Sequence, residues 1–343
     1  PGPTVGFKVG IRPGYQGLLT YLQGAHVVKD DGSEYDTFTT KFYPSLSQSS
    51  IDIGTWTTPS ETSNPSVAGA WRIYETLMQD AYDRGAWDFL INERGVSADS
   101  MGVVKVKFPV PDTDTDGAYY SDLWGEIHIH PIEYSKSLDV AQHEYGHAAM
   151  HRMGKWPLGQ GITWRCPDRH YWSDTEDATC AWTEGWANFF PLMVQSWGRS
   201  DDMLFEYDGS TSFKLELPTW FRPLTWDDGP TVEGRIVGAL WDLYDSAGDG
   251  YDTFSGGFSP IWNTYNSATF YSFQDFWNKW KSKGYDQSNT GAVASLYQNT
   301  VELTPKFLKP PSNLVASPAS SSQINLSWQD NSGDESDFHI ERK

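Results

Sequence analysis

The sequence predicts an α+β fold, because predicted strands precede a histidine motif at residues 143–147 and most predicted helices follow it. Residues 4–55 contain β-branched and aromatic runs separated by turn clusters. From residue 67 onward, apolar residues recur at helical spacing. A Ser/Thr/Pro stretch at residues 57–65 marks the change. We therefore expect a β-rich N-terminal segment at residues 1–56 and the main domain at residues 57–307.

The same patterns place each element in chain order. Strands are expected at residues 4–11, 18–29, 50–56, 103–110 and 126–130. Helices are expected at residues 67–81, 138–153, 181–197, 232–244, 273–281 and 291–299. Pro191 lies inside the third of these helices, where it should kink the helix or mark its end.

The composition changes again near the C-terminus, at residues 308–343. A Pro-Pro start is followed by Leu-Val-Ala at residues 314–316, by Ile-Asn-Leu-Ser-Trp at residues 324–328 and by a third short run at residues 338–341. This segment resembles the first three strands of a fibronectin type III domain. Because such a sandwich needs about seven strands, we expect a truncated module that is either disordered or packed on its neighbour.

Charge and composition exclude several classes of partner. The formal net charge is −20 and the pI is about 4.6, so we expect a solvated acidic surface that repels nucleic acid and anionic membranes. No apolar run approaches the roughly 18 residues that a membrane helix needs. The chain opens with Pro1-Gly2-Pro3 and shows no charged-then-apolar leader, so a signal peptide is expected to be absent or removed.

The chain has two cysteines, Cys166 and Cys180, which are 14 residues apart. This spacing favours a local disulfide, which would stabilise the enclosed loop by about 3 kcal/mol in the chain-entropy model. Two free buried thiols are the alternative. The choice matters because the loop leads into the segment that carries the expected third metal ligand.

The strongest chemical signal is the HExxH sequence His143-Glu144-Tyr145-Gly146-His147, on a helix for which Ser137 is the expected N-cap. At positions i and i+4 both imidazoles project from one face of a helix and can share one ion. Glu144 lies beside them, where it can take a proton from a metal-bound water. The alternative is an ordinary amphipathic helix with two exposed histidines.

A catalytic zinc site needs three protein ligands and one open position, so a third ligand is required. The metzincin spacing would need a histidine where this chain has Met153. Glu176 lies in a polar loop, whereas Glu184 opens a strongly apolar helix. A lone carboxylate among tryptophans is costly to bury unless it is paired or bound to a metal. We therefore expect Glu184 as the ligand, with Glu176 as the alternative, and Gly185 as the residue that lets two helices approach closely.

Three further features accompany the motif: Trp182-Thr183-Glu184-Gly185-Trp186-Ala187, the loop between the cysteines, and Leu240-Trp241-Asp242-Leu243. With them, residues 54–245 resemble secreted bacterial and archaeal gluzincin-like metallopeptidases. The resemblance implies a zincin-like domain, zinc, secretion, endopeptidase activity on extracellular proteins, and Glu184 as the third ligand. Many gluzincins have an Asp four residues after that Glu. Here the residue is Asn188, whose amide oxygen could accept a hydrogen bond from a zinc-bound histidine.

These residues predict a mechanism. Zinc held by His143, His147 and Glu184 would lower the pKa of a bound water toward neutrality. Glu144 would accept the proton of this water as it attacks a peptide carbonyl, and would then deliver the proton to the leaving amine.

The tetrahedral oxyanion needs a donor besides the metal. His170 and Tyr171, in the loop closed by the cysteines, are the expected catalytic candidates, and His170 is preferred. Tyr145 and Arg235 are alternatives, and a locally bonded loop histidine is the other interpretation of His170. Residues 232–235 could face the cleft, but we prefer a structural ion pair for the charged residues of this segment.

Two other interpretations remain open. Residues 112–117 resemble the first half of an EF-hand loop, but its twelfth position is Leu123 rather than Glu, so a turn is preferred over a Ca²⁺ site. The chain could also be a non-catalytic secreted or cell-surface protein that binds glycans or peptides in Trp-rich clefts. The fibronectin-like segment fits association with a cell surface or extracellular matrix. That function leaves the HExxH sequence unexplained, so a protein or peptide substrate is the expected partner.

Overall fold

The computed structural model describes most of the chain, in segments separated by gaps. The described residues are 10–11, 24–35, 37–38, 59–78, 85–111, 117–130, 137–157, 166, 170–195, 204–206, 212–214, 226–248, 250–333, 335, 338 and 340. The expected strand at residues 50–56 and the EF-hand-like residues 112–116 lie outside this part.

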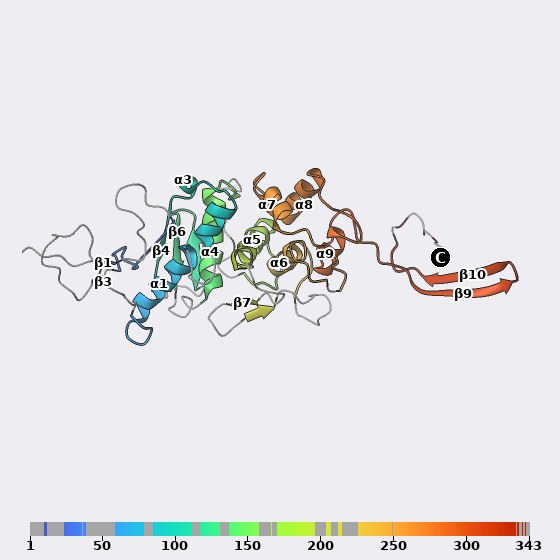
Figure 1. Ribbon diagram of the computed structural model, residues 1–343, viewed down its shortest axis with the longest axis horizontal. Coiled ribbons are helices and arrows are strands. Elements are labelled where there is room, and N and C mark those ends of the chain that lie inside the picture. Colours follow the sequence, from blue (N-terminus) through green and yellow to red (C-terminus); the bar gives the residue numbers. More distant parts are fainter. Residues whose placement is uncertain are drawn as a thin grey trace, which may run out of the picture.

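A four-stranded sheet forms one half of the main body, in the order β2-β4-β6-β5. The strands are β2 (Gly24–Val28), β4 (Val103–Lys107), β5 (Ala118–Ser121) and β6 (Glu126–Ile129). Strand β4 pairs in parallel with β2 on one side and with β6 on the other, and β5 pairs antiparallel with β6 at the edge of the sheet. Helices α1 (Pro65–Met78) and α4 (Leu138–Arg152) pack on this sheet (Figure 1).

Helices make up the other half. They are α5 (Ala178–Gln195), α6 (Glu233–Asp242), α7 (Phe258–Tyr265), α8 (Phe273–Ser282) and α9 (Ala292–Gln298). Helix α5 lies between α4 on one side and α6 on the other. Its tryptophans anchor the core: Trp186 stacks on Tyr265 with ring centroids 3.7 Å apart, and Trp182 stacks on Phe276 at 5.3 Å. These aromatic contacts hold α5 against α7 and α8.

Several short elements complete the described structure. A helical turn α2 (Ala86–Asp88) continues into a π-helical turn η1 (Phe89–Glu93), and α3 (Ala98–Met101) follows. Two small antiparallel pairs are β1 (Gly10–Ile11) with β3 (Thr37–Phe38), and β7 (Leu204–Glu206) with β8 (Ser212–Lys214).

The predicted mixture of strands and helices is confirmed, and each predicted helix has a counterpart within a few residues of its expected ends. Strand β5 and helix α7 were not predicted. Pro191 does not end α5, which continues through Pro191 to Gln195. An internal proline removes one helix hydrogen bond and crowds the carbonyl four residues earlier, but a helix buried on all sides can retain it when its packing outweighs these costs.

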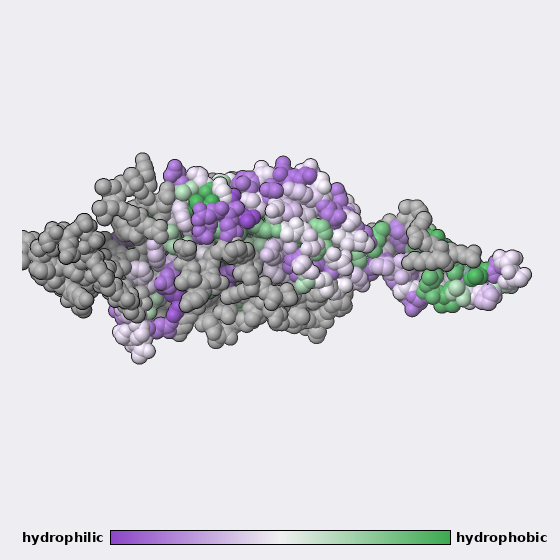
Figure 2. Space-filling view, in the orientation of Figure 1, coloured by the Kyte–Doolittle hydropathy of each residue, from purple (hydrophilic) through white to green (hydrophobic). Residues whose placement is uncertain are grey.

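The C-terminal segment forms an antiparallel hairpin of β9 (Ser312–Ser320) and β10 (Gln323–Gln329). It projects beyond α9 (Figure 1), and its surface is rich in apolar side chains (Figure 2). Leu314, Val315 and Ile324 are each more than half exposed. Trp328 contacts Phe338 with ring centroids 5.2 Å apart, but Phe338 and Ile340 are not in a strand. The described residues of the segment thus form an exposed hairpin, and a truncated fibronectin type III module stays a prediction.

Candidate metal centre

Helix α4 begins as its sequence predicts. Ser137 is the N-cap, and its Oγ accepts a hydrogen bond from the backbone N–H of Val140 at 3.2 Å. One turn of helix separates His143 from His147, and their rings meet edge to face with centroids 4.7 Å apart. Both rings are largely buried. The alternative of two exposed histidines on an amphipathic helix is therefore wrong.

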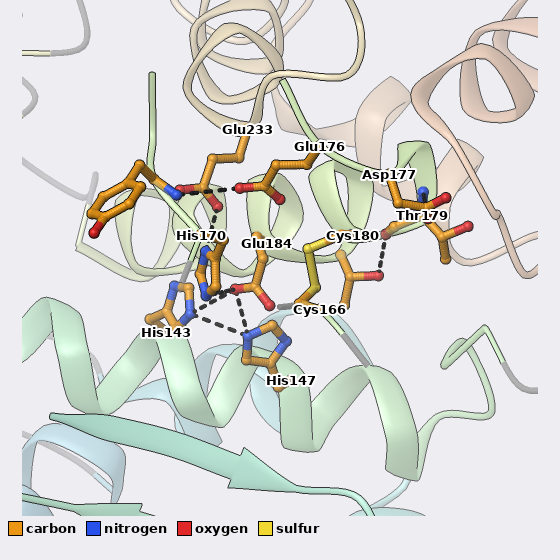
Figure 3. Close-up of a disulfide and its surroundings, with 12 residues drawn as sticks. His143, His147, Cys166, His170, Glu176, Asp177, Thr179, Cys180, Glu184 and Glu233 are labelled. Carbon is orange, nitrogen blue, oxygen red and sulfur yellow. Dashed lines mark hydrogen bonds and ion pairs between the residues drawn. A yellow bond between two sulfur atoms is a disulfide. The ribbon is translucent and has the colours of Figure 1, made fainter. Parts of the chain in front are cut away.

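Helix α5 brings the carboxylate of Glu184 next to the rings of His143 and His147 (Figure 3). Its Oε2 lies 3.1 Å from Nε2 of His147 and 3.3 Å from Nε2 of His143, and the two Nε2 atoms are 3.1 Å apart. The carboxylate comes from a helix 37 residues further along and is only 7% exposed. Of the two glutamates expected as alternatives, Glu184 is the one that contacts the histidine pair.

Two glycines permit close helix packing around the site, and the one that was expected to do so, Gly185, faces a different helix from the one expected. A Cβ atom on Gly146 of α4 would lie 3.1 Å from Cβ of Phe190 on α5, so Gly146 permits the close approach of those helices. Gly185 instead faces α6, where an added Cβ would lie 2.8 Å from Cγ2 of Ile236. The close contact expected at Gly185 is therefore with the helix that carries Glu233.

The three donor atoms fit a divalent cation better than they fit hydrogen bonds. Oε2 of Glu184 can accept from both rings only if both Nε2 atoms carry hydrogen, and those N–H groups would then face each other at 3.1 Å. A cation at their centre satisfies all three lone pairs. Ligands of tetrahedral zinc at roughly 2.0–2.1 Å lie about 3.3–3.4 Å apart, close to the separations here. Two imidazoles and one carboxylate are a donor set that zinc favours.

Glu144 lies beside this triangle, with Oε1 4.0 Å from Nε2 of His143. It is buried, and burial raises the pKa of its carboxyl to about 7; nearby His143 acts in the opposite direction. A carboxyl that titrates near neutrality can both accept and return a proton at physiological pH.

His170 lies at the rim of the triangle, and its two ring nitrogens face different carboxylates (Figure 3). Nε2 is 3.9 Å from Oε2 of Glu184, and Nδ1 is 3.2 Å from Oε2 of Glu233. Burial alone would lower the pKa of His170, but Glu184, Glu233 and Glu176 outweigh it and raise the pKa to about 10. The three carboxylates therefore favour an imidazolium that carries N–H on both nitrogens.

Glu233 is a site residue that sequence reasoning did not select. It has no exposed surface, and its only hydrogen-bond partner in the described part of the chain is His170. Burial raises the pKa of its carboxyl, while the bond to His170 lowers it. Both charged residues of this segment are paired: Glu233 with His170, and Arg235 with Asp228, with Nη2 2.9 Å from Oδ1. A contact across 63 residues leaves no local pattern by which to find it.

The segment after His170 is fastened to the start of α6. The N–H of Gly234 donates to the carbonyl of Trp172, and the N–H of Glu176 donates to the carbonyl of Thr231. Thr175 also forms an isolated β-bridge with Val232. These contacts hold residues 170–176 against the helix that carries Glu233.

The remaining candidates lie further from the triangle. Tyr171 is 56% exposed, and its backbone N–H donates to Oε1 of Glu176 at 3.2 Å. Tyr145 is fully buried in the core, so it is not the oxyanion donor. Asn188 is buried one turn after Glu184, but within the described residues no hydrogen bond joins it to His143 or His147. A role for Asn188 behind the metal stays a prediction.

The predicted disulfide between Cys166 and Cys180 is present. Cys180 lies one turn before Glu184 on α5, and both sulfur atoms lie within 4.8 Å of a carboxylate oxygen of Glu184. The bridge thus ties the start of the His170 segment to the helix that supplies the third donor (Figure 3).

Comparison with known proteins gives one match. The family model described as the mycolysin C-terminal domain matches residues 97–300, which is 204 of the 343 residues and includes His143, His147 and Glu184. No curated protein and no solved structure matches the chain. Within the described residues, no helix combines the length and apolarity needed to cross a membrane.

Proposed function

Because this chain belongs to the family of the mycolysin C-terminal domain, which relates it to secreted metallopeptidases, we propose that it is a zinc-dependent endopeptidase with a zincin-like catalytic domain. Its substrates would be peptide bonds of extracellular proteins. One observation carries the proposal: Nε2 of His143, Nε2 of His147 and Oε2 of Glu184 all lie within 3.3 Å of one another. The family match spans this site.

Zinc held by those three residues would supply an activated water and would polarise the carbonyl of the substrate. Glu144 has the position and the chemistry of the general base. Its carboxylate takes a proton as water attacks the carbonyl and returns that proton to the leaving amine. Burial supports this function, since a pKa near 7 balances both transfers.

His170 serves as the donor to the oxyanion that develops on the peptide carbonyl. Its Nε2 points toward Glu184, at the edge of the donor triangle. Glu233 orients the ring, because its buried carboxylate accepts from Nδ1 and so presents Nε2 to the site. Tyr171 is the weaker candidate, since its side chain is exposed.

Zinc content tests this function without knowledge of the substrate. We expect about one zinc per wild-type chain, since a three-ligand site binds one ion. Glu184→Ala should lose most of the metal, whereas the matched variant Glu176→Ala removes a nearby carboxylate that is not a ligand and should retain it. Equal zinc in wild type and Glu184→Ala would reject the ligand set. No zinc in a folded wild-type chain would reject the enzyme.

Hydrolysis of an unstructured protein such as casein tests the chemistry. Glu144→Gln should retain zinc and lose turnover, because the amide keeps the shape of the side chain and cannot accept the proton. Turnover equal to that of wild type would remove Glu144 from the mechanism.

A further inference from the structure

Glu184 lies between two sets of potential metal donors. On one side are the imidazoles of His143 and His147, and on the other is the disulfide of Cys166 and Cys180. The sulfur atoms and a Glu184 carboxylate oxygen lie within 4.8 Å of one another (Figure 3). The proposed function uses the first set only.

Oxidation state decides whether the second set can bind a metal. A disulfide sulfur is a poor ligand, whereas a thiolate is among the strongest ligands for zinc and similar soft divalent cations, with a bond of about 2.3 Å. Cys180 has no exposed surface, but Cys166 is partly exposed, so a reductant can reach the bridge.

Reduction would leave both thiols beside the site. Cys180 is buried in the first turn of α5, one turn before Glu184. Cys166 precedes His170 by four residues. From His170 onward the segment is held at the start of α6: His170 bonds to Glu233, the carbonyl of Trp172 accepts from the N–H of Gly234, and Thr175 forms a β-bridge with Val232. Opening the bridge therefore does not release the segment as a whole. Rotation about its Cα–Cβ bond lets a cysteine thiol take up another staggered position.

We propose that Cys166 and Cys180, once reduced, form with Glu184 a second set of ligands for a soft divalent cation. Their thiolates then take the open coordination position at the metal centre, so that no water can bind there and the centre is silenced. A dithiol reductant supplies two electrons and two protons and becomes a disulfide, while the S–S bond of the chain breaks into two thiols. Each thiol releases its proton when its sulfur binds the cation. The inference rests on the proposed function, since Glu184 holds the metal in both.

Cobalt(II) tests the inference, because thiolate ligands give cobalt an intense near-ultraviolet charge-transfer absorption that imidazole and carboxylate ligands do not give. The full chain is loaded with cobalt before and after reduction with a water-soluble phosphine, which carries no thiol of its own. We expect the absorption to appear only after reduction. Casein hydrolysis by the zinc-loaded chain should be lost in the same step.

Two variants separate ligation from loss of structure. Cys166→Ser leaves Cys180 without a bridge, so the charge-transfer absorption should appear with no reductant. Cys166→Ser/Cys180→Ser has no thiol and should show none in either condition. Circular dichroism on each sample identifies any that has unfolded.

The outcomes distinguish this inference from the proposed function. Cobalt bound without thiolate absorption both in the reduced chain and in Cys166→Ser would overturn the inference and leave the proposed function intact. Thiolate absorption in the reduced chain, together with no cobalt in the oxidised chain, would support the cysteine set and reject the histidine centre. Cobalt bound in neither state would reject both.

Discussion

Nδ1 of His170 lies 3.2 Å from Oε2 of Glu233, although the two residues are 63 positions apart and Glu233 is completely buried. A buried carboxylate costs several kcal/mol unless it is paired. Its pairing with a histidine at the edge of a donor triangle therefore makes His170 and Glu233 one functional unit, and each residue of the pair can be tested through the other.

Glu233→Gln should lower kcat by about 10- to 1,000-fold while KM and zinc content stay close to those of wild type. The amide can still pack, but it can no longer favour the cationic ring of His170 or fix its orientation. Nitrogen-15 NMR of the zinc-loaded protein should show a changed protonation pattern of the His170 ring. Glu176→Gln is the control for loss of charge alone, because Glu176 also raises the pKa of His170 but forms no hydrogen bond with its ring among the described residues. If both variants match wild type in kcat, Glu233 does not position the ring.

His170→Ala should reduce turnover by about 100- to 1,000-fold, the usual cost of removing one oxyanion donor. Zinc content should not change, since His170 is not among the three expected ligands. The double variant His170→Ala/Glu233→Gln should be little worse than His170→Ala, because the glutamate acts through the histidine. Additive losses would show that the two side chains act separately.

The metal-free protein should become less stable as pH rises from about 4.5 to 7, in part because of Glu144. Burial raises its pKa to about 7 in the folded chain, so over this range the folded state binds more protons than the unfolded state. The difference is worth about 3 kcal/mol at full titration. Urea unfolding after treatment with a chelator should show a smaller fall for Glu144→Gln than for wild type. An identical pH dependence in the two proteins would contradict the raised pKa.

Gly185→Ala should destabilise the fold by about 1–3 kcal/mol, the usual cost of overpacking. The added methyl group would lie 2.8 Å from Cγ2 of Ile236 and 3.3 Å from the carbonyl oxygen of Glu233. Thermal unfolding measures the loss. Trimming the neighbour in Gly185→Ala/Ile236→Val should recover part of it, although Ile236→Val alone is destabilising. Purely additive losses would place the strain elsewhere.

Local sequence patterns predicted one half of the site. Spacing placed His143 and His147 on one face of a helix, and the apolar setting of Glu184 distinguished it from Glu176. These features follow from helix periodicity and from the cost of burying charge, both of which can be seen in a short stretch of sequence.

The other half depends on tertiary packing. The bond from Glu233 to His170 requires α6 to lie against α5, and Gly185 gave no indication of which helix it faces. Strand β5 was missed because it has only four residues and a burial pattern without clear alternation. Helix α7 was missed because it has only eight residues, about two turns, which is too short for a helical period to stand out in the sequence.

The exposed β9–β10 hairpin should promote association of the chain in concentrated solution. Its strands expose apolar side chains on both faces, and their outer edges are not paired with any other described strand. Free edges and apolar faces are the features through which strands of separate molecules adhere. The net charge of −20 makes separate molecules repel one another, but only over a Debye length, about 8 Å at physiological salt. The second virial coefficient should therefore change from positive, which indicates net repulsion between molecules, to negative, which indicates net attraction, as salt is added.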